Sequence, residues 1–305
     1  MIDIHSLRIV LTFLGYLSLF AFCGVVLAKI WLVPAPAFEQ TEVFLRWRQM
    51  LNECLAVLVF AGVAILLAYT AEIDDATLPG MLVDLPGIIA KTHFGLIWAM
   101  HLATLLVIWI GCAALTTRWA SRRWTALMVT GLLVLAFTYS ASSHASDSGD
   151  FTLGELVDWV HVAATAAWGG SILISVALIF PLLRDRHSTI SLAASRLSAL
   201  AGSALPFALV SGFYNSSVQL HTFGALLETT YGRLLTAKLA IVVMLVLIGA
   251  LNRFVIASRI RRCPLANVAG PDRPLRLLSL ALAVDAVLVL LAITMAAILG
   301  QYDTT

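Results

Sequence analysis

Three side chains that can bind a metal ion recur at every third position of one apolar stretch. Glu155, Asp158 and His161 would form a ridge along a helix, and Trp168 follows two turns later on almost the same face. Imidazole suits copper, zinc or iron, and carboxylates can serve as oxygen ligands beside it. The spacing therefore predicts a line of metal ligands that descends from one end of a helix.

A second apolar stretch carries His93 and His101, which lie eight residues, or about 12 Å, apart along a helix. Met100 stands beside His101, and Met295 lies in another apolar stretch; thioether sulfur is a soft ligand that suits reduced copper. His101 and His161 both fall within apolar zones, where ionisable groups are rare and by default functional. We expect these two imidazoles to converge on one pocket.

A buried histidine can instead be a hydrogen-bonding group between helices, and a methionine can be core filler. For His93, His144 or His221 alone, which lie near the ends of apolar stretches, this structural role is the better interpretation, although all three remain candidate ligands. Lys238 lies a few residues inside its stretch and can reach outward along its own alkyl chain. Asp285 lies near the middle of the last stretch, so it must be protonated, paired or on an aqueous path.

The elements that position these residues follow from composition. Of 305 residues, 61% are hydrophobic and 12% charged, and the mean hydropathy is +0.96. Soluble domains carry about twice that share of charge. Apolar runs of membrane-spanning length occur at about 7–31, 51–71, 93–115, 124–143, 156–183, 198–219, 233–256 and 275–300. The sequence predicts an all-α, polytopic bundle of eight transmembrane helices, which forms a single integral membrane domain over residues 1–305.

Arginines mark one side of this bundle. They concentrate in the connections after the first, third, fifth and seventh helices, and the alternate connections hold only Lys91 and Arg233. The positive-inside rule then predicts that the odd-numbered loops are cytoplasmic and both termini periplasmic. The same topology places Trp47 and Trp124 at the inner interface, and all four cysteines on the inner, reduced side.

Several function classes are excluded. The net charge of +2 is too small to indicate a nucleic-acid partner, and the arginines act as topology determinants. The sequence holds no Walker-type motif, no phosphorylated-aspartate motif and no cytoplasmic segment of nucleotide-binding size. We expect neither an ATPase nor another enzyme.

Several segments between residues 155 and 256 resemble the CopD/PcoD copper-resistance membrane proteins. The first two are Asp158-Trp159-Val160-His161 and Trp168-Gly169-Gly170, and the third is Ser211-Gly212-Phe213-Tyr214-Asn215. The fourth is Thr230-Tyr231-Gly232-Arg233-Leu234-Leu235, which continues through Lys238-Leu239 to Asn252-Arg253. By this match, the family-like positions are His161, Trp168, Tyr231, Gly232, Arg233, Lys238 and Asn252.

The resemblance implies a multi-pass protein of the bacterial inner membrane that transfers or imports copper ions from the periplasm, with a separate CopC-like copper-binding protein as its partner. Two other interpretations stay open. His101 and His161 at equal depth on facing helices would hold haem b, as in a membrane cytochrome. Alternatively, the chain is a non-transporting subunit whose outer acidic loops dock a periplasmic protein.

Overall fold

The protein is a bundle of long helices in a computed structural model that describes residues 4–38, 40–74, 78–114, 121–146, 149–220, 224–256 and 272–302. The long helices are α1 (Ile4–Leu27), α3 (Thr41–Asp74), α5 (His93–Ala114), α6 (Arg122–Ala141), α7 (Leu153–Ile174), α9 (His187–Gln219), α11 (Thr230–Leu251) and α13 (Asp272–Leu299). Among the described residues, eight helical segments are long and apolar enough to cross a membrane. The predicted all-α bundle of eight spans is confirmed.

Short elements extend or join these helices. Three of them are π-helical turns that continue a long helix: η1 (Ala28–Leu32) after α1, η3 (Ser175–Ile179) after α7 and η4 (Asn252–Ile256) after α11. The others are α2 (Ala35–Phe38), α4 (Leu78–Lys91), η2 (His144–Ser146), α8 (Phe180–Leu183) and α10 (Ala225–Glu228). α3 and α9 begin about ten residues before the predicted apolar runs. Their first turns are polar, so hydropathy does not detect them, but they are helical.

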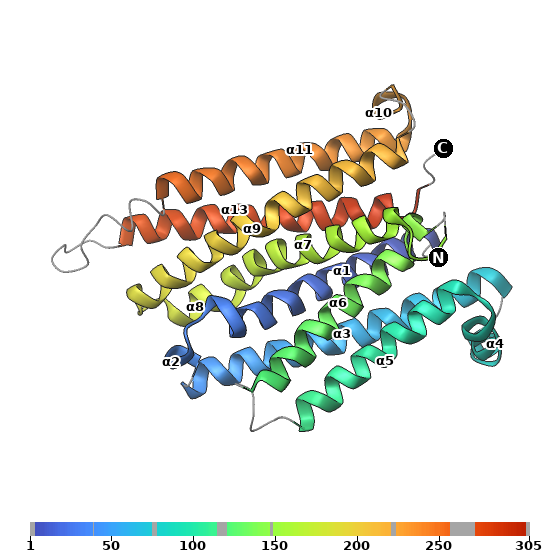
Figure 1. The fold of residues 1–305 in the computed structure, drawn as a ribbon, viewed down its shortest axis with the longest axis horizontal. Coiled ribbons are helices and arrows are strands. Elements are labelled where there is room, and N and C mark those ends of the chain that lie inside the picture. The colour runs from blue at the N-terminus through green and yellow to red at the C-terminus, as the bar shows by residue number, and fades with distance from the viewer. Residues whose placement is uncertain are drawn as a thin grey trace.

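Both described termini lie at the same end of the bundle, together with α4 and α10 (Figure 1). We name this the termini end. The opposite end holds α2, α8 and η4, and we name it the arginine end because Arg184, Arg186 and Arg253 lie there (Figure 1). An even number of spans returns the chain to its starting side, as predicted, while the assignment of that side to the periplasm stays a prediction.

Helix α1 runs through the middle of the bundle and packs against α3, α6, α7 and α13. Its contact with α7 is backbone to backbone: a Cβ on Gly24 would overlap the Gly170 carbonyl group, and one on Gly170 would overlap the carbonyl of Phe20. In lipid, where apolar surface alone gives no drive for helices to associate, such close packing of small residues holds helices together. The Gly169-Gly170 sequence therefore serves the α1–α7 contact.

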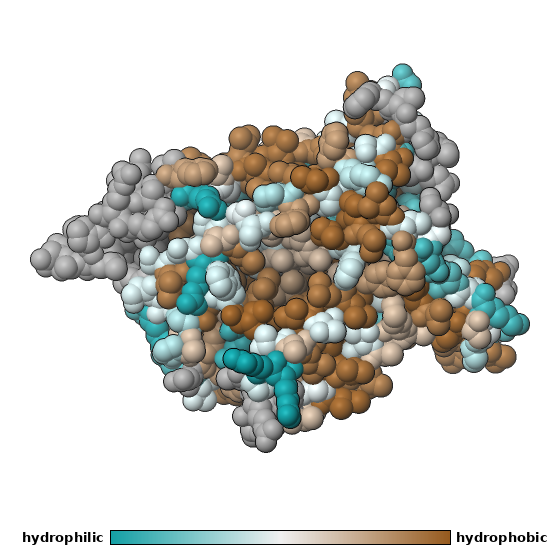
Figure 2. Space-filling model, viewed as in Figure 1, coloured by the Kyte–Doolittle hydropathy of each residue, from teal (hydrophilic) through white to brown (hydrophobic). Residues whose placement is uncertain are grey.

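Trp47 and Trp124 are fully buried, with ring centroids 5.7 Å apart. The Trp47 indole donates a hydrogen bond to the Val25 carbonyl oxygen at 2.8 Å. These two rings lie inside the bundle, because the core at the arginine end offers them a packing partner and an acceptor. Their place at the inner membrane interface stays a prediction. Apolar residues instead cover much of the outer face of the helices (Figure 2).

Candidate functional site

A cavity of about 830 Å³ lies among α1, α7, α9, α11 and α13, in the half of the bundle toward the termini end. Most of its wall is apolar. The chemically versatile side chains on the wall are Tyr16, His144, Asp158, His161, Tyr231 and Lys238. All but Tyr16 and His144 fall within the segments whose sequence resembles the copper-resistance proteins, so the fold gathers those scattered segments around one space.

His161 presents an unprotonated nitrogen. Its Nδ1 lies 3.0 Å from the Ala208 carbonyl oxygen and 3.1 Å from the Ser211 hydroxyl oxygen, both on α9. A carbonyl oxygen only accepts, and the Ser211 hydroxyl already donates to Phe207, so Nδ1 must carry the ring proton. Nε2 keeps its lone pair. Metal-binding histidines are commonly held in this way, with the other ring nitrogen donating to a carbonyl oxygen.

Gly212 makes the position of His161 possible. A Cβ at Gly212 would lie 2.8 Å from Cε1 of the imidazole, which is closer than carbon atoms can pack. The glycine lets α9 approach α7, so that the ring seats against the α9 backbone while the residue still lines the cavity.

Asp158 lies one turn from His161 on α7 and also lines the cavity. Its Oδ1 accepts a hydrogen bond from Asn215 Nδ2 at 2.7 Å, and its Oδ2 accepts one from the Ser143 hydroxyl at 3.2 Å. Both carboxylate oxygens thus lie within hydrogen-bond distance of a polar side chain. Sequence reasoning missed Asn215 and Ser143 as members of this site, although Asn215 ends one of the resembling segments.

Lys238 of α11 lines the cavity together with Asp158 of α7. Tyr231, two turns before Lys238 on the same side of α11, is buried, and its hydroxyl donates to Gln219 Oε1 on α9. Arg233 is exposed and does not line the cavity. Trp168 is buried and forms part of the wall below His161.

His101 lies elsewhere. It is fully buried on α5, where Nδ1 is 2.8 Å from the Thr138 hydroxyl oxygen of α6, and the rings of Trp98 and Tyr139 pack against it. The cavity lining does not include His101, and α6 packs against both α5 and α7. The expectation of a shared pocket with His161 was wrong, and the haem alternative loses the facing pair on which it depended.

The remaining predicted ligands are also dispersed. Met100 and Met295 do not line the cavity, while His144 does, at the termini end. His93 is half exposed. Its Nε2 lies 2.9 Å from the Ala141 carbonyl oxygen, and its Nδ1 lies 3.3 Å from Asp150 Oδ1. His221 lies outside the described residues. The structure therefore leaves His161 and Asp158, with His144 near them in the lining, as the predicted ligands that share the cavity.

Glu155 has a structural task. Its carboxylate accepts a hydrogen bond from the Phe151 backbone N–H at 2.5 Å, and its own N–H donates to the Thr152 hydroxyl at 3.3 Å. This arrangement resembles a capping box at the start of α7, with the difference that the carboxylate accepts from Phe151, the residue before the N-cap Thr152. Glu155 is buried and does not line the cavity, so the ligand ridge begins at Asp158. The Thr152-x-x-Glu155 spacing was the sequence signal that could have shown this.

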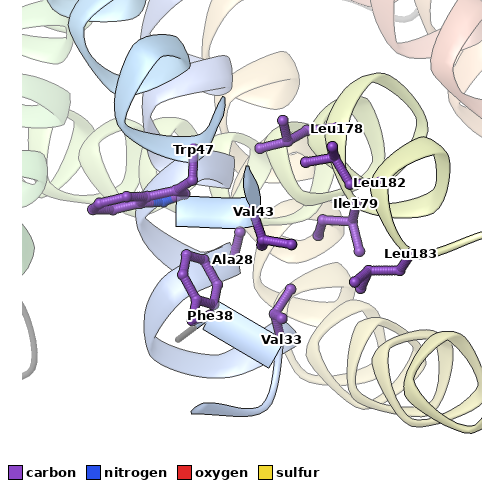
Figure 3. A pocket seen from close by; sticks show the side chains of 9 residues that line it. All are labelled: Ala28, Val33, Phe38, Val43, Trp47, Leu178, Ile179, Leu182 and Leu183. Carbon is purple, nitrogen blue, oxygen red and sulfur yellow. The ribbon is translucent and has the colours of Figure 1, made fainter. Parts of the chain in front are cut away.

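Asn252 and Asp285 form a separate buried pair in the other half of the bundle, joined by a hydrogen bond of 3.0 Å from Asn252 Nδ2 to Asp285 Oδ2. Figure 3 shows a further pocket near the arginine end, of about 10 Å³, whose walls are apolar side chains around Trp47. It is too small and too apolar to bind an ion.

No group of three or more histidine, cysteine, aspartate or glutamate side chains among the described residues is arranged to hold a metal ion. The cavity instead offers the His161 imidazole and the Asp158 carboxyl group a helical turn apart, with the His144 imidazole also in its lining. Structural metal sites are commonly closed by four protein ligands. Two ligands beside open space suit an ion that binds and leaves.

Two family models match the chain. Residues 1–154 match a model described as the N-terminal domain of copper resistance protein D-like proteins, and residues 191–299 match copper resistance protein D. The chain belongs to the copper resistance protein D family. Asp158 and His161, on α7, fall between the two matched ranges, whereas Asn215, Tyr231 and Lys238 fall within the second.

A curated relative of this copper resistance family member is the copper transport protein CutJ of Bacillus subtilis (strain 168). The two are 30% identical over 188 residues, which is 58% of this chain and 34% of CutJ, so the match spans about a third of that relative. No solved structure matches the chain. The protein is thus a multi-pass membrane protein of a copper-handling family.

Proposed function

We propose that the protein moves copper ions through the membrane, with His161 and Asp158 as the cargo-binding residues in the cavity. The observation that carries this proposal is the free lone pair of His161 Nε2, fixed by the hydrogen bond between Nδ1 and Ala208, on the wall of a space large enough for an ion with water. Imidazole nitrogen is a preferred copper ligand. The family supplies the identity of the metal.

The incomplete ligand set supports a carrier. A site that supplied four protein ligands would hold copper tightly, whereas conduction needs binding that is strong enough to load and weak enough to release. Asp158 adds oxygen ligands beside His161, and Lys238 lines the same cavity. A lysine ammonium group there repels a bound cation, which weakens binding and so favours release.

Direction and location follow from the charge bias of the loops. If the arginine end is cytoplasmic, the cavity lies in the periplasmic half, and copper moves from the termini end toward the arginine end. The membrane is then the bacterial inner membrane, and the cavity would receive copper from a separate CopC-like periplasmic protein. We further propose that residues 1–305 form one membrane domain, because α1 and α13, from the two family-matched ranges, pack together, and that this domain is a carrier and no enzyme.

The test is copper uptake by proteoliposomes that contain only this protein. Wild-type protein should load copper faster than empty liposomes, and His161→Ala should lower uptake to the level of empty liposomes. His93→Ala is the matched control, because His93 is half exposed, does not line the cavity and should leave uptake intact. Uptake by His161→Ala equal to wild type would overturn the assignment of the site. Absence of uptake by the wild-type protein would instead favour the non-transporting docking subunit.

A further inference from the structure

Two aspartate–asparagine pairs occur among the described residues, and they differ in how their oxygens are satisfied. In the cavity, both oxygens of Asp158 accept hydrogen bonds, one from Asn215 and one from Ser143. In the other half, Asp285 on α13 accepts one hydrogen bond, from Asn252 Nδ2 to its Oδ2 at 3.0 Å. Each carboxylate oxygen of the first pair therefore has a donor, whereas one carboxylate oxygen of the second pair has none.

Two oxygens of the second pair lack a donor. Asp285 is 2% exposed and Asn252 is 8% exposed. Asp285 Oδ1 and Asn252 Oδ1 are buried and have no hydrogen-bond partner among the described residues. Each can only accept when Asp285 is ionised, and burial of acceptors without donors is costly. One added proton would remove the deficit, because a carboxylic acid donates from one oxygen and accepts at the other.

Among the described residues, none of the elements around Asp285 forms an ion pair with it. The titratable or charged side chains of this half on elements that pack against α13 are Cys23 of α1 and Arg253 of η4. Arg253 donates through Nη1 to the Ser198 carbonyl oxygen of α9 at 2.7 Å. On α13 itself, Arg276 is nine residues, or about 13 Å, from Asp285 along the axis. In this half, α7 and η3 contribute only serine hydroxyls as polar side chains.

We propose that Asp285 and Asn252 form a proton-binding site, in which a proton on Asp285 Oδ1 supplies the donor that Asn252 Oδ1 lacks. The amide then donates to the acid and accepts from it. The opposite assignment of the Asn252 amide atoms would place two oxygens 3.0 Å apart, and a proton would again have to lie between them. Both assignments of the amide therefore give the same protonation state.

The pair lies directly below the floor of the cavity. Val289, one turn from Asp285 on the same face of α13, lines the cavity, and so does Leu245, two turns from Asn252 on α11. Lys238 is further away, fourteen residues or about 21 Å from Asn252 along that helix. The helices α11 and α13 run side by side through this region (Figure 1). The proton is therefore bound between the cavity and the arginine end.

Asn252 is also the first residue of the π-helical turn η4, which interrupts the regular hydrogen bonding of the helix. Such turns occur frequently at functional sites. Release of the proton would leave a carboxylate and an amide oxygen beneath the cavity, a pair that attracts a cation. The last step rests on the proposed function. If the protein moves copper, loss of the proton would draw copper toward the arginine end, so that copper and protons move in opposite directions.

Infrared spectroscopy of the purified full-length protein without copper tests the proton site directly. The difference spectrum between wild type and Asp285→Asn at neutral pH should show the C=O stretch of a protonated carboxyl group. In the matched control, Asp158→Asn, the C=O band that Asp285→Asn removes should remain in the spectrum. Carboxylate stretches in the Asp285→Asn difference spectrum would overturn the proposal.

A second variant, Asn252→Leu, tests the same proton site if Asp285→Asn fails to fold. Loss of the amide partner should move the C=O stretch of Asp285 to higher wavenumber without removing the side chain. No change in the carboxylic-acid region would overturn the proposal.

Coupling is tested by copper uptake into proteoliposomes with and without a pH gradient. Wild-type uptake should change several-fold with the gradient, and uptake by Asp285→Asn, which carries no exchangeable acid, should not. A gradient response that persists in Asp285→Asn would refute the coupling. If wild-type protein takes up no copper at all, the proposed function fails, and the infrared result still decides the proton site.

Discussion

His101 and His161 have nearly the same local chemistry and opposite access. His101 Nδ1 lies beside the Thr138 hydroxyl, which donates to the Leu135 carbonyl oxygen, so Nδ1 carries the proton as it does in His161. His101 Nε2 is buried and has no partner among the described residues, whereas His161 lines the cavity. The tautomer does not separate a candidate ligand from a structural histidine. The neighbouring helices separate them, because they leave His161 on the cavity wall and enclose His101.

The largest expected effect is on copper affinity when His161 is removed. We expect His161→Ala to weaken copper binding by on the order of 100-fold, because loss of a ligand should cost at least as much as the changes around a ligand that cost 10–100-fold. His101→Ala should bind copper within about twofold of wild type. Equilibrium dialysis of purified protein with copper analysis measures both. If the two variants lose affinity equally, the contrast between the two sites is wrong.

The second effect acts on the position of the ring. Gly212→Ala places a methyl group against Cε1 of His161 and should displace the imidazole, which lowers copper affinity by roughly tenfold. Gly249→Ala is the matched control, since no atom lies within 4 Å of its added Cβ. If Gly212→Ala binds copper with unchanged affinity, then copper binding does not depend on the packing of the His161 ring against α9.

A smaller effect is expected at Ser211. Ser211→Ala removes one of two acceptors for the His161 Nδ1 proton, but the Ala208 carbonyl oxygen remains at 3.0 Å. Copper affinity should fall about twofold, the size expected when a weak hydrogen bond is lost and its donor keeps a partner. The same dialysis measurement detects it, and a loss as large as that of His161→Ala would show that the serine binds the ion itself.

The smallest effect on copper is expected at Thr138. Thr138→Val leaves His101 Nδ1 without an acceptor in a sealed site, so it should lower the free energy of unfolding by about 1–3 kcal/mol and leave copper affinity unchanged. Unfolding in mixed detergent measures the stability. Thr104→Val is the control, because that hydroxyl bonds only to its own helix. A fall in copper affinity in Thr138→Val would give His101 a role in binding.

The sequence predicts the fold well because lipid imposes a length and a composition on every span. All eight predicted apolar runs are helices in the structure. The spacing of Asp158 and His161 also predicts that they share one helix face. The sequence pattern does not predict which helices surround that face, because helix neighbours in a membrane depend on details of packing that composition does not encode. That is why His101 was placed with His161, and why Asn215 and Ser143 were missed.

The backbone contact between α1 and α7 has a mechanical consequence. Because the backbones of α1 and α7 are in contact at Gly24 and Gly170, rotation or sliding of either helix would cause a steric clash, and we expect the two helices to move as one rigid unit. His161 and Asp158 belong to this rigid unit, the frame, while Lys238 and the Asp285–Asn252 pair belong to the α11–α13 hairpin. We expect the hairpin to be the part that rocks when the cargo passes, and the frame to stay still.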